Sequence, residues 1–183
     1  MCYNNAYFIK EGDLMSDKTK KIVFTALFAA LSAVATLVIS IPSPMQGYVH
    51  LGDCIVLLCG WTLGPIYGTV AAGVGSALAD IIAGYTLYAP ITLVIKGSVA
   101  LLAYYIRRLL LKRVGNTVSL IISATLAELL MIGGYYLFEG IVYGFIPSLV
   151  NIPANAMQAL SGVVFGSILM SSIGKHITFY LNK

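Results

Sequence analysis

The sequence predicts an all-α integral membrane protein, a bundle of six transmembrane helices with a short second helix and both termini in the cytoplasm. Of its 183 residues, 59% are hydrophobic and 10% are charged, against about 25% charged residues in an ordinary soluble domain. Long apolar runs alternate with short polar connections, and most basic residues gather in those connections. A soluble chain of this length has too little interior to bury so much apolar surface, so lipid must surround most of it.

The first three predicted helices are set by their apolar runs and by what ends them. Residues 22–41 carry no charge and stop at Pro42, which begins a loop. Residues 54–63 are apolar, but a helix needs about 20 residues to cross the hydrocarbon core, so this helix is too short to cross alone. The third helix, residues 66–83, is rich in small side chains and carries Asp80 near its end.

Two charges interrupt the helices that follow. Residues 89–106 form the predicted fourth helix around Lys96, and residues 117–138 form the fifth around Glu128. A long uncharged stretch comes next. Pro153 marks the start of the sixth helix within it, because proline is well tolerated in a first helical turn.

The basic residues orient the bundle, because cytoplasmic loops of membrane proteins carry an excess of lysine and arginine. With both termini inside, ten of the eleven basic residues face the cytoplasm, and the exception is Lys96. The expected location is the bacterial plasma membrane, which the chain crosses several times. We expect residues 18–183 to form a single six-helix domain. Residues 1–17 are expected to be a polar leader, either disordered or added by cloning.

Lys96 and Glu128 are the two charges inside predicted spans, where each costs roughly 2.5–3.5 kcal/mol at a helix centre. Lys96 lies about seven residues, or about 10 Å, from the outer end of its helix, and Glu128 lies at a comparable depth. We expect the two side chains to pair, or to share a polar ligand, in the outer half of the bundle. The alternative is a purely structural ion pair, or a lysine that extends outward to water.

Three amides form a second polar set at the outer start of the sixth helix. Asn151, Asn155 and Gln158 are spaced four and three residues apart, so one helix face carries all three. Neutral amides can recognise hydrogen-bond donors and acceptors on a heterocycle. The alternative is that Asn151 caps the helix while the other two bond to neighbouring helices. Asn155 and Gln158 are the better candidates for binding.

Aromatic and polar side chains crowd the predicted outer side. Tyr85 and Tyr88 lie near Asp80 and could stack on a planar ligand. Tyr48 and His50, in the loop after the first helix, complete the set of candidate binding residues. For most of the tyrosines the alternative is an aromatic belt at the membrane surface.

The first predicted helix carries two flat alanine surfaces. Ala26 and Ala30 are four residues apart, as are Ala29 and Ala33. Small residues let helices approach closely, so these surfaces serve either internal packing or the docking of another membrane subunit.

Motifs for several other functions are missing from the sequence. It contains no Walker loop, so the chain cannot hydrolyse ATP itself. Its three cysteines have no metal-ligand spacing, and it has no basic patch for nucleic acid. We therefore expect no cofactor, no metal site and no nucleic-acid partner.

Several short motifs together resemble a known family, the S components (substrate-binding membrane subunits) of energy-coupling factor (ECF) vitamin transporters. The resemblance covers residues 18–180. The motifs that carry it are Ala26-Leu-Phe-Ala29-Ala30, Tyr48-Val-His50-Leu-Gly52-Asp53, Leu63-Gly64-Pro65-Ile-Tyr-Gly68, Gly75-Ser-Ala-Leu-Ala-Asp80, Tyr88-Ala-Pro90 and Ile95-Lys96-Gly97. The subgroup looks like the one for hydroxymethylpyrimidine or pyridoxine uptake.

The resemblance implies a division of labour between subunits. The S component would hold one small-molecule vitamin in an outward pocket, while a membrane T component and two cytoplasmic ATPases supply the power. Loading would be followed by toppling of the S component in the lipid bilayer, with residues 42–52 as the gate. Ala26 and Ala30 would dock the T component. The pocket would include Lys96, Glu128, Asn155 and Gln158.

Other interpretations remain open. The cargo could be another planar nutrient, such as riboflavin, thiamin or a queuosine precursor. From other classes, the chain could be a small membrane enzyme that uses Glu128 and Lys96 as acid and base, or a structural membrane subunit.

Overall fold

The computed structural model describes residues 17–38, 40–42 and 48–181. The elements in chain order are α1 (Asp17–Val38), β1 (Ser40–Pro42), β2 (Tyr48–His50), α2 (Asp53–Leu63), α3 (Pro65–Ile82), α4 (Ala89–Val114), α5 (Asn116–Tyr143), α6 (Phe145–Ser148), the 3-10 helix η1 (Leu149–Asn151) and α7 (Ile152–Leu181). Except for Asp17, the predicted leader lies outside the described residues, and so do residues 43–47 of the predicted gate.

Within the described residues, five helical segments are long and apolar enough to cross a membrane. They are Lys18–Val38, Pro65–Ile82, Ala89–Val114, Asn116–Tyr143 and Phe145–Gly174. The remaining apolar helix, α2, has only 11 residues. The prediction of a helical membrane bundle with a short second helix is confirmed. A sixth crossing and the cytoplasmic position of both termini stay predictions.

Several helix ends differ from the sequence-based expectation, among them the start of α1 at Asp17 and the end of α5 at Tyr143. α1 stops at Val38, because residues 40–42 leave the helix and pair with β2 as an antiparallel hairpin. α4 continues to Val114, through the basic residues that the charge pattern had placed in a loop. Long basic side chains can extend from a helix end to the headgroups, so charge alone does not end a membrane helix.

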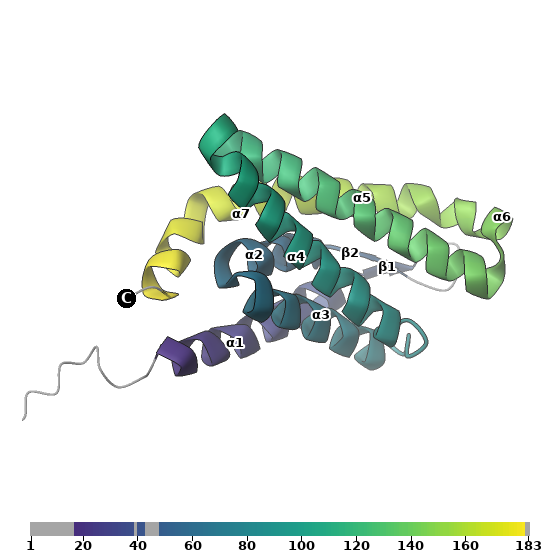
Figure 1. The fold of residues 1–183 in the computed structure, drawn as a ribbon. Helices are drawn as coiled ribbons and strands as arrows, with labels where there is room; N and C mark the ends of the chain where they lie inside the picture. Colours follow the sequence, from purple (N-terminus) through teal and green to yellow (C-terminus); the bar gives the residue numbers. More distant parts are fainter. Residues whose placement is uncertain (1–16, 39, 43–47, 182–183) are drawn as a thin grey trace, which may run out of the picture.

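The helices lie in layers. α5 and α7 form one layer and α1 and α3 another, with α2 and α4 between them (Figure 1). α2 and α4 are in close contact because Gly60 has no side chain: a Cβ there would lie 2.1 Å from the carbonyl oxygen of Ala100. This contact helps to set the short helix against α4, the helix that carries Lys96.

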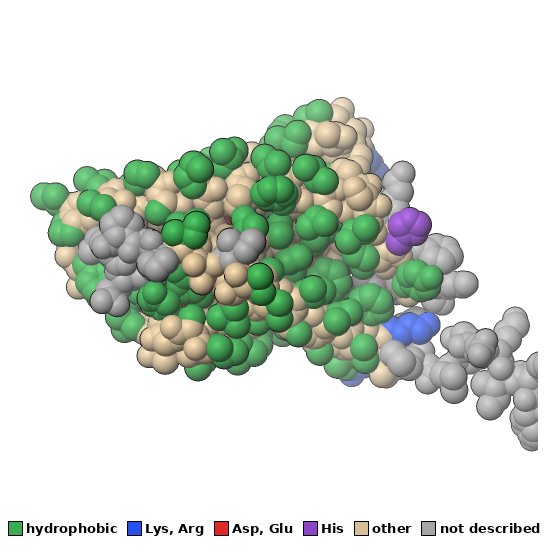
Figure 2. All heavy atoms as spheres, turned by 180° about the vertical axis from the view of Figure 1, so that it is seen from behind, with side chains coloured by type: hydrophobic (Ala, Val, Ile, Leu, Met, Phe, Trp, Pro, Cys, Tyr) green, Lys and Arg blue, Asp and Glu red, His purple; other side chains and the backbone are tan. Residues whose placement is uncertain are grey.

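The surface of the bundle is suited to lipid. Figure 2 shows hydrophobic side chains along the length of one face, with lysine and arginine gathered toward one end. The start of α1, the α4–α5 junction and the end of α7 all lie at that end (Figure 1). A few other charged residues, among them Asp53, Lys96 and Glu128, are buried inside the bundle. Lysine and arginine thus gather at one end of the bundle, as the positive-inside rule predicts, with Lys96 as the buried exception.

Candidate functional site

A cavity opens at the opposite end of the bundle, where the β-hairpin, the α3–α4 connection and the start of α7 meet. Its empty volume is about 430 Å³, which includes the open mouth. The lining side chains come from β2, α3, α4, α5, η1, α7 and the α3–α4 connection. They are Tyr48, His50, Asp80, Tyr85, Tyr88, Thr92, Tyr135, Glu139, Asn151, Asn155 and Gln158.

Aromatic rings form one wall of the cavity. The ring centroid of Tyr48 lies 4.8 Å from that of Tyr85 and 5.3 Å from that of His50. The Tyr48 hydroxyl donates a hydrogen bond to Asp80 Oδ1 at 2.8 Å, which fixes the ring beside α3. Burial and the nearby carboxylate of Asp80 raise the pKa of Tyr48, so its hydroxyl stays a neutral donor.

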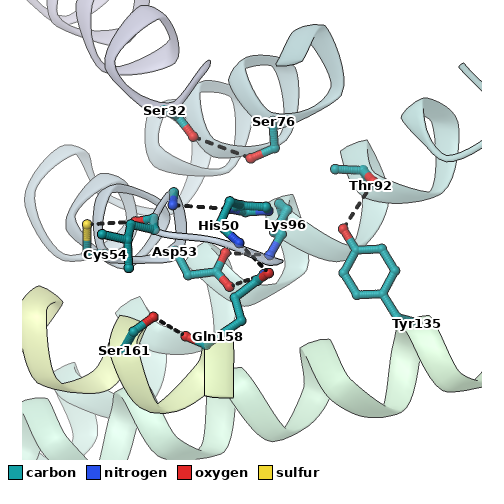
Figure 3. A network of polar contacts seen from close by, with 12 residues as sticks. Ser32, His50, Asp53, Cys54, Ser76, Thr92, Lys96, Tyr135, Gln158 and Ser161 are labelled. Carbon is teal, nitrogen blue, oxygen red and sulfur yellow. Dashed lines mark hydrogen bonds and ion pairs between the residues drawn. The ribbon is translucent and has the colours of Figure 1, made fainter. Parts of the chain in front are cut away.

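A second polar group joins α5 to η1 and to the residue that precedes α4. The Tyr88 hydroxyl and the side-chain nitrogen of Asn151 both donate to Glu139 Oε1, at 3.3 and 2.9 Å. Deeper in the wall, the hydroxyls of Thr92 and Tyr135 lie 3.0 Å apart (Figure 3). Burial and Glu139 raise the pKa of Tyr88, so this hydroxyl also remains protonated.

A fully buried ion pair joins α2 and α4 beneath the cavity. Lys96 Nζ, on α4, contacts Asp53 Oδ1, in the first turn of α2, and neither side chain has any solvent exposure (Figure 3). Removing such charges from water is costly unless they are paired and fully hydrogen-bonded. The short second helix therefore brings the counter-charge that α4 needs.

Gln158 connects this ion pair to the cavity wall. Its Nε2 donates to Asp53 Oδ2 at 2.7 Å, and its Oε1 accepts from the backbone N–H of His50 at 3.1 Å. The ring of His50 accepts at Nδ1 from the backbone N–H of Gly52, at 3.0 Å. Burial, together with the charge of Lys96, lowers the pKa of His50 to about 3. The ring is therefore neutral, with its proton on Nε2.

The structure brings most of the predicted binding residues to one cavity. Among the lining residues are seven of them: Tyr48, His50, Asp80, Tyr85, Tyr88, Asn155 and Gln158. Lys96 and Glu128 lie outside that lining set and are buried within the bundle.

The expected pair of Lys96 with Glu128 was wrong, since Lys96 pairs with Asp53. The reason is the position of α2, whose first turn lies against α4 and supplies the closer carboxylate. Glu128 lies beside the pair: a Cβ at Gly162 would lie 3.0 Å from both Asp53 Cβ and Glu128 Oε1. Neither oxygen of Glu128 has a hydrogen-bond partner within the described residues.

Sequence reasoning missed four residues of the site: Asp53, Thr92, Tyr135 and Glu139. It considered a fifth, Asn151, but ranked it below its neighbours. One usable signal was the spacing of Glu128, Tyr135 and Glu139, which are seven and four residues apart and so share a helix face. Asp53 gave a weaker signal, as an acid at the head of an apolar segment too short to cross the membrane.

The two alanine surfaces of α1 have different surroundings. A Cβ at Gly75 of α3 would lie 2.3 Å from the carbonyl oxygen of Ala29, so this side of α1 packs against α3. The hydroxyls of Ser32 and Ser76 lie 3.3 Å apart at the same contact (Figure 3). Ala33 is half-buried. Ala26 and Ala30 are exposed, so a partner can reach them.

The arrangement is one for binding. The part of the chain that the structure describes holds no group of three or more histidine, cysteine or acidic side chains placed to hold a metal ion. The lining residues offer aromatic faces and several fixed polar groups, which is the usual composition of a small-molecule site.

Comparisons with known proteins give a consistent picture. The sequence model of the family described as "ECF-type riboflavin transporter, S component" matches residues 16–175. A protein of Pyrococcus woesei, described as "Uncharacterized protein in gap 3'region", is 34% identical over 145 residues, which cover 79% of this chain and 95% of that protein. The thiamine precursor transporter HmpT of Lactococcus lactis subsp. cremoris is 26% identical over 159 residues, 85% of this chain and 89% of the relative.

A solved structure shares the fold. It is described as "Structure and mechanism of the S component of a bacterial ECF transporter" and matches with a TM-score of 0.64 at 22% identity. The match covers 91% of this chain and 99% of the solved one, so almost the whole bundle has a counterpart.

Proposed function

The chain belongs to the family of ECF-type S components, and we propose that it binds hydroxymethylpyrimidine, a single-ring thiamine precursor, in the cavity beside β2. Proteins of this family are multi-pass subunits of the plasma membrane that bind a vitamin or vitamin precursor for import, and they are not enzymes. The choice of this cargo is the part of the proposal that needs an experiment.

One observation carries the choice of cargo: the cavity is small, has an aromatic wall and holds several convergent polar groups. The empty volume of this cavity is about 430 Å³ even when its open mouth is counted, so the enclosed part is smaller still. That size favours one heteroaromatic ring over the three fused rings of a flavin. The name of the Lactococcus relative, a thiamine precursor transporter, supports the same choice.

Each group of lining residues has a proposed role. Tyr48, Tyr85 and Tyr88 would stack on the ring or pack at its edges, because offset aromatic contacts occur at centroid distances of about 4.5–7 Å. Asn155 and Gln158 would fix the orientation of the ring through amide hydrogen bonds.

The remaining site residues lie at different distances from the proposed ligand position, and their proposed roles differ accordingly. Asp80 and His50 would contribute polar contacts at the cavity wall. Lys96 would act through Asp53, by holding the carboxylate that orients Gln158. Glu128, beside the same pair, would complete this support or receive a ligand group that reaches deeper.

The family implies partners as well. An S component works with a membrane T component and two ATPases, which supply the energy that this chain cannot. We propose that the exposed surface of Ala26 and Ala30 docks the T component, because two small side chains four residues apart allow a close helix crossing. The loaded subunit would then topple in the bilayer to release its cargo inside.

The test is uptake of labelled hydroxymethylpyrimidine by cells that lack their own route for it and express this chain with a T component and both ATPases. The expected result is saturable uptake that pyridoxine and riboflavin in excess leave unchanged. Uptake that excess riboflavin or pyridoxine abolishes would reassign the cargo to that vitamin. No uptake of any vitamin, from correctly assembled complexes, would refute the proposal.

A further inference from the structure

Three buried oxygen atoms at the cavity wall have no hydrogen-bond partner among the described residues. They are Asp80 Oδ2, Glu139 Oε2 and Asn151 Oδ1. Their residues are 5%, 3% and 3% exposed, so bulk water does not reach these atoms freely. A buried acceptor left without a donor costs about 1–3 kcal/mol, and more when it is charged.

The neighbouring oxygens of the two carboxyl groups are already hydrogen-bonded. The first oxygen of Asp80 takes the hydroxyl of Tyr48, and the first oxygen of Glu139 takes both Tyr88 and Asn151. These three donors of the wall are thus already engaged. Among the described lining residues, every buried side-chain nitrogen or oxygen without a partner is an acceptor.

The charges of the lining residues also favour a ligand that carries hydrogen-bond donors. Two of the three residues are carboxyl groups, and the lining residues that the structure describes include no lysine or arginine to balance them. Lys96, on the same helix as part of the wall, is engaged with Asp53 beneath the cavity. A ligand that brings donors, or a positive charge, would therefore complement these oxygens.

We propose that Asp80, Glu139 and Asn151 form an acceptor subsite that selects ligands carrying an exocyclic amine beside a hydroxyl group. This inference rests on the proposed function and narrows it to one chemical feature of the cargo. An amine supplies two N–H donors to the subsite, and a hydroxymethyl group supplies a third donor. An oxo group in place of the amine would set a carbonyl oxygen against a carboxylate, with no donor between them.

The selection is expected to be strong. Sites built to hydrogen-bond a polar group of the substrate can reject analogues that lack it by factors of 10⁴–10⁵. We expect a preference of at least about 100-fold here, since a water molecule can offset part of the loss.

The experiment compares matched ligand pairs by calorimetry on the purified protein. The pairs are hydroxymethylpyrimidine with its 4-oxo analogue, and thiamine with oxythiamine. The subsite predicts that the amino member binds tighter in every pair that binds at all. Equal affinities within the pairs, or a preference for the oxo members, would overturn it.

Two variants test whether these residues make the selection. Asp80→Asn and Glu139→Gln keep the shape of each side chain but turn one acceptor into a donor. Each is expected to reduce the amino preference at least tenfold, with unfolding of the ligand-free variant measured in parallel. A preference unchanged in both folded variants would remove these residues from the selection.

The panel separates this inference from the choice of cargo. Tight binding of hydroxymethylpyrimidine and its oxo analogue alike would keep the cargo and refute the subsite. A strong amino preference confined to the thiamine pair would keep the subsite and refute the cargo. A panel in which nothing binds would contradict both.

Discussion

The side-chain oxygen of Gln158 accepts a hydrogen bond from the backbone N–H of His50 at 3.1 Å, joining residues 108 positions apart in the chain. The same side chain donates to Asp53, whose other oxygen pairs with Lys96. One glutamine thus ties strand β2, at the mouth of the cavity, to the ionic centre of the bundle. The binding wall and the buried charges are parts of one network.

Removing this glutamine should weaken binding. Gln158→Leu leaves the Asp53 oxygen and the His50 N–H without their partner, and hydrogen bonds to charged groups contribute about 1.5–3 kcal/mol. We expect at least a tenfold loss of ligand affinity together with a lower unfolding temperature. The control is Ser161→Ala on the same helix, whose hydroxyl bonds only to the backbone oxygen of Gln158 in the described structure. Equal affinities of the two variants would contradict the account.

The ion pair should behave as a unit. Lys96→Met leaves Asp53 as an unpaired buried carboxylate, and breaking such a pair costs about 3–5 kcal/mol. Adding Asp53→Asn should recover most of that loss, because the amide is neutral and its oxygen can still accept from Gln158. Thermal unfolding in detergent measures both variants.

The double variant also decides how Lys96 acts. If Lys96 supports the wall only through Asp53, the double variant should recover both its stability and most of its ligand affinity. Recovered stability with affinity still lost would instead mean that Lys96 contacts the ligand itself.

The stability of the fold should depend on pH because of His50. Its pKa is about 3 in the fold, against roughly 6.5 in an unfolded chain, so between these values the unfolded state binds more protons. The contribution of this group to the free energy of unfolding is therefore largest above about pH 6.5, and it falls as the pH drops toward 3. His50→Gln should flatten the decline in unfolding temperature between pH 7.5 and 5. The matched control is His176→Gln, at an exposed position of α7, and an identical effect of the two variants would exclude this role.

The alanine surface of α1 separates binding from transport. Ala30→Trp should leave ligand affinity within twofold and abolish uptake, because a large side chain blocks the close helix crossing. Leu31→Trp is the control: it is also exposed, and it points about 100° further round the helix. Loss of uptake in both variants would mean that docking does not depend on the alanine surface.

Sequence reasoning predicted the membrane bundle, the short second helix and most of the cavity wall, because these depend on local patterns. Apolar length, prolines and the spacing of residues such as Asn155 and Gln158 can be read along one helix. The hairpin of residues 40–42 with 48–50 could not be predicted from the sequence. Its first strand continues an apolar run that a helix would fit equally well.

The partner of Lys96 depended on packing between helices. The sequence offered Glu128 at a similar depth on the next helix, and nothing in the pattern showed that α2 would bring Asp53 closer. That outcome depends on a contact such as the one between Gly60 and Ala100, which exists only after the helices are assembled.

The central claim is that this cavity binds one small aminated heteroaromatic ring. The most direct test is isothermal titration calorimetry of the detergent-purified protein with hydroxymethylpyrimidine, pyridoxine, thiamine and riboflavin. The account predicts nanomolar one-to-one binding of hydroxymethylpyrimidine and at least a hundredfold weaker binding of riboflavin. Tight riboflavin binding, with no heat from hydroxymethylpyrimidine, would contradict it.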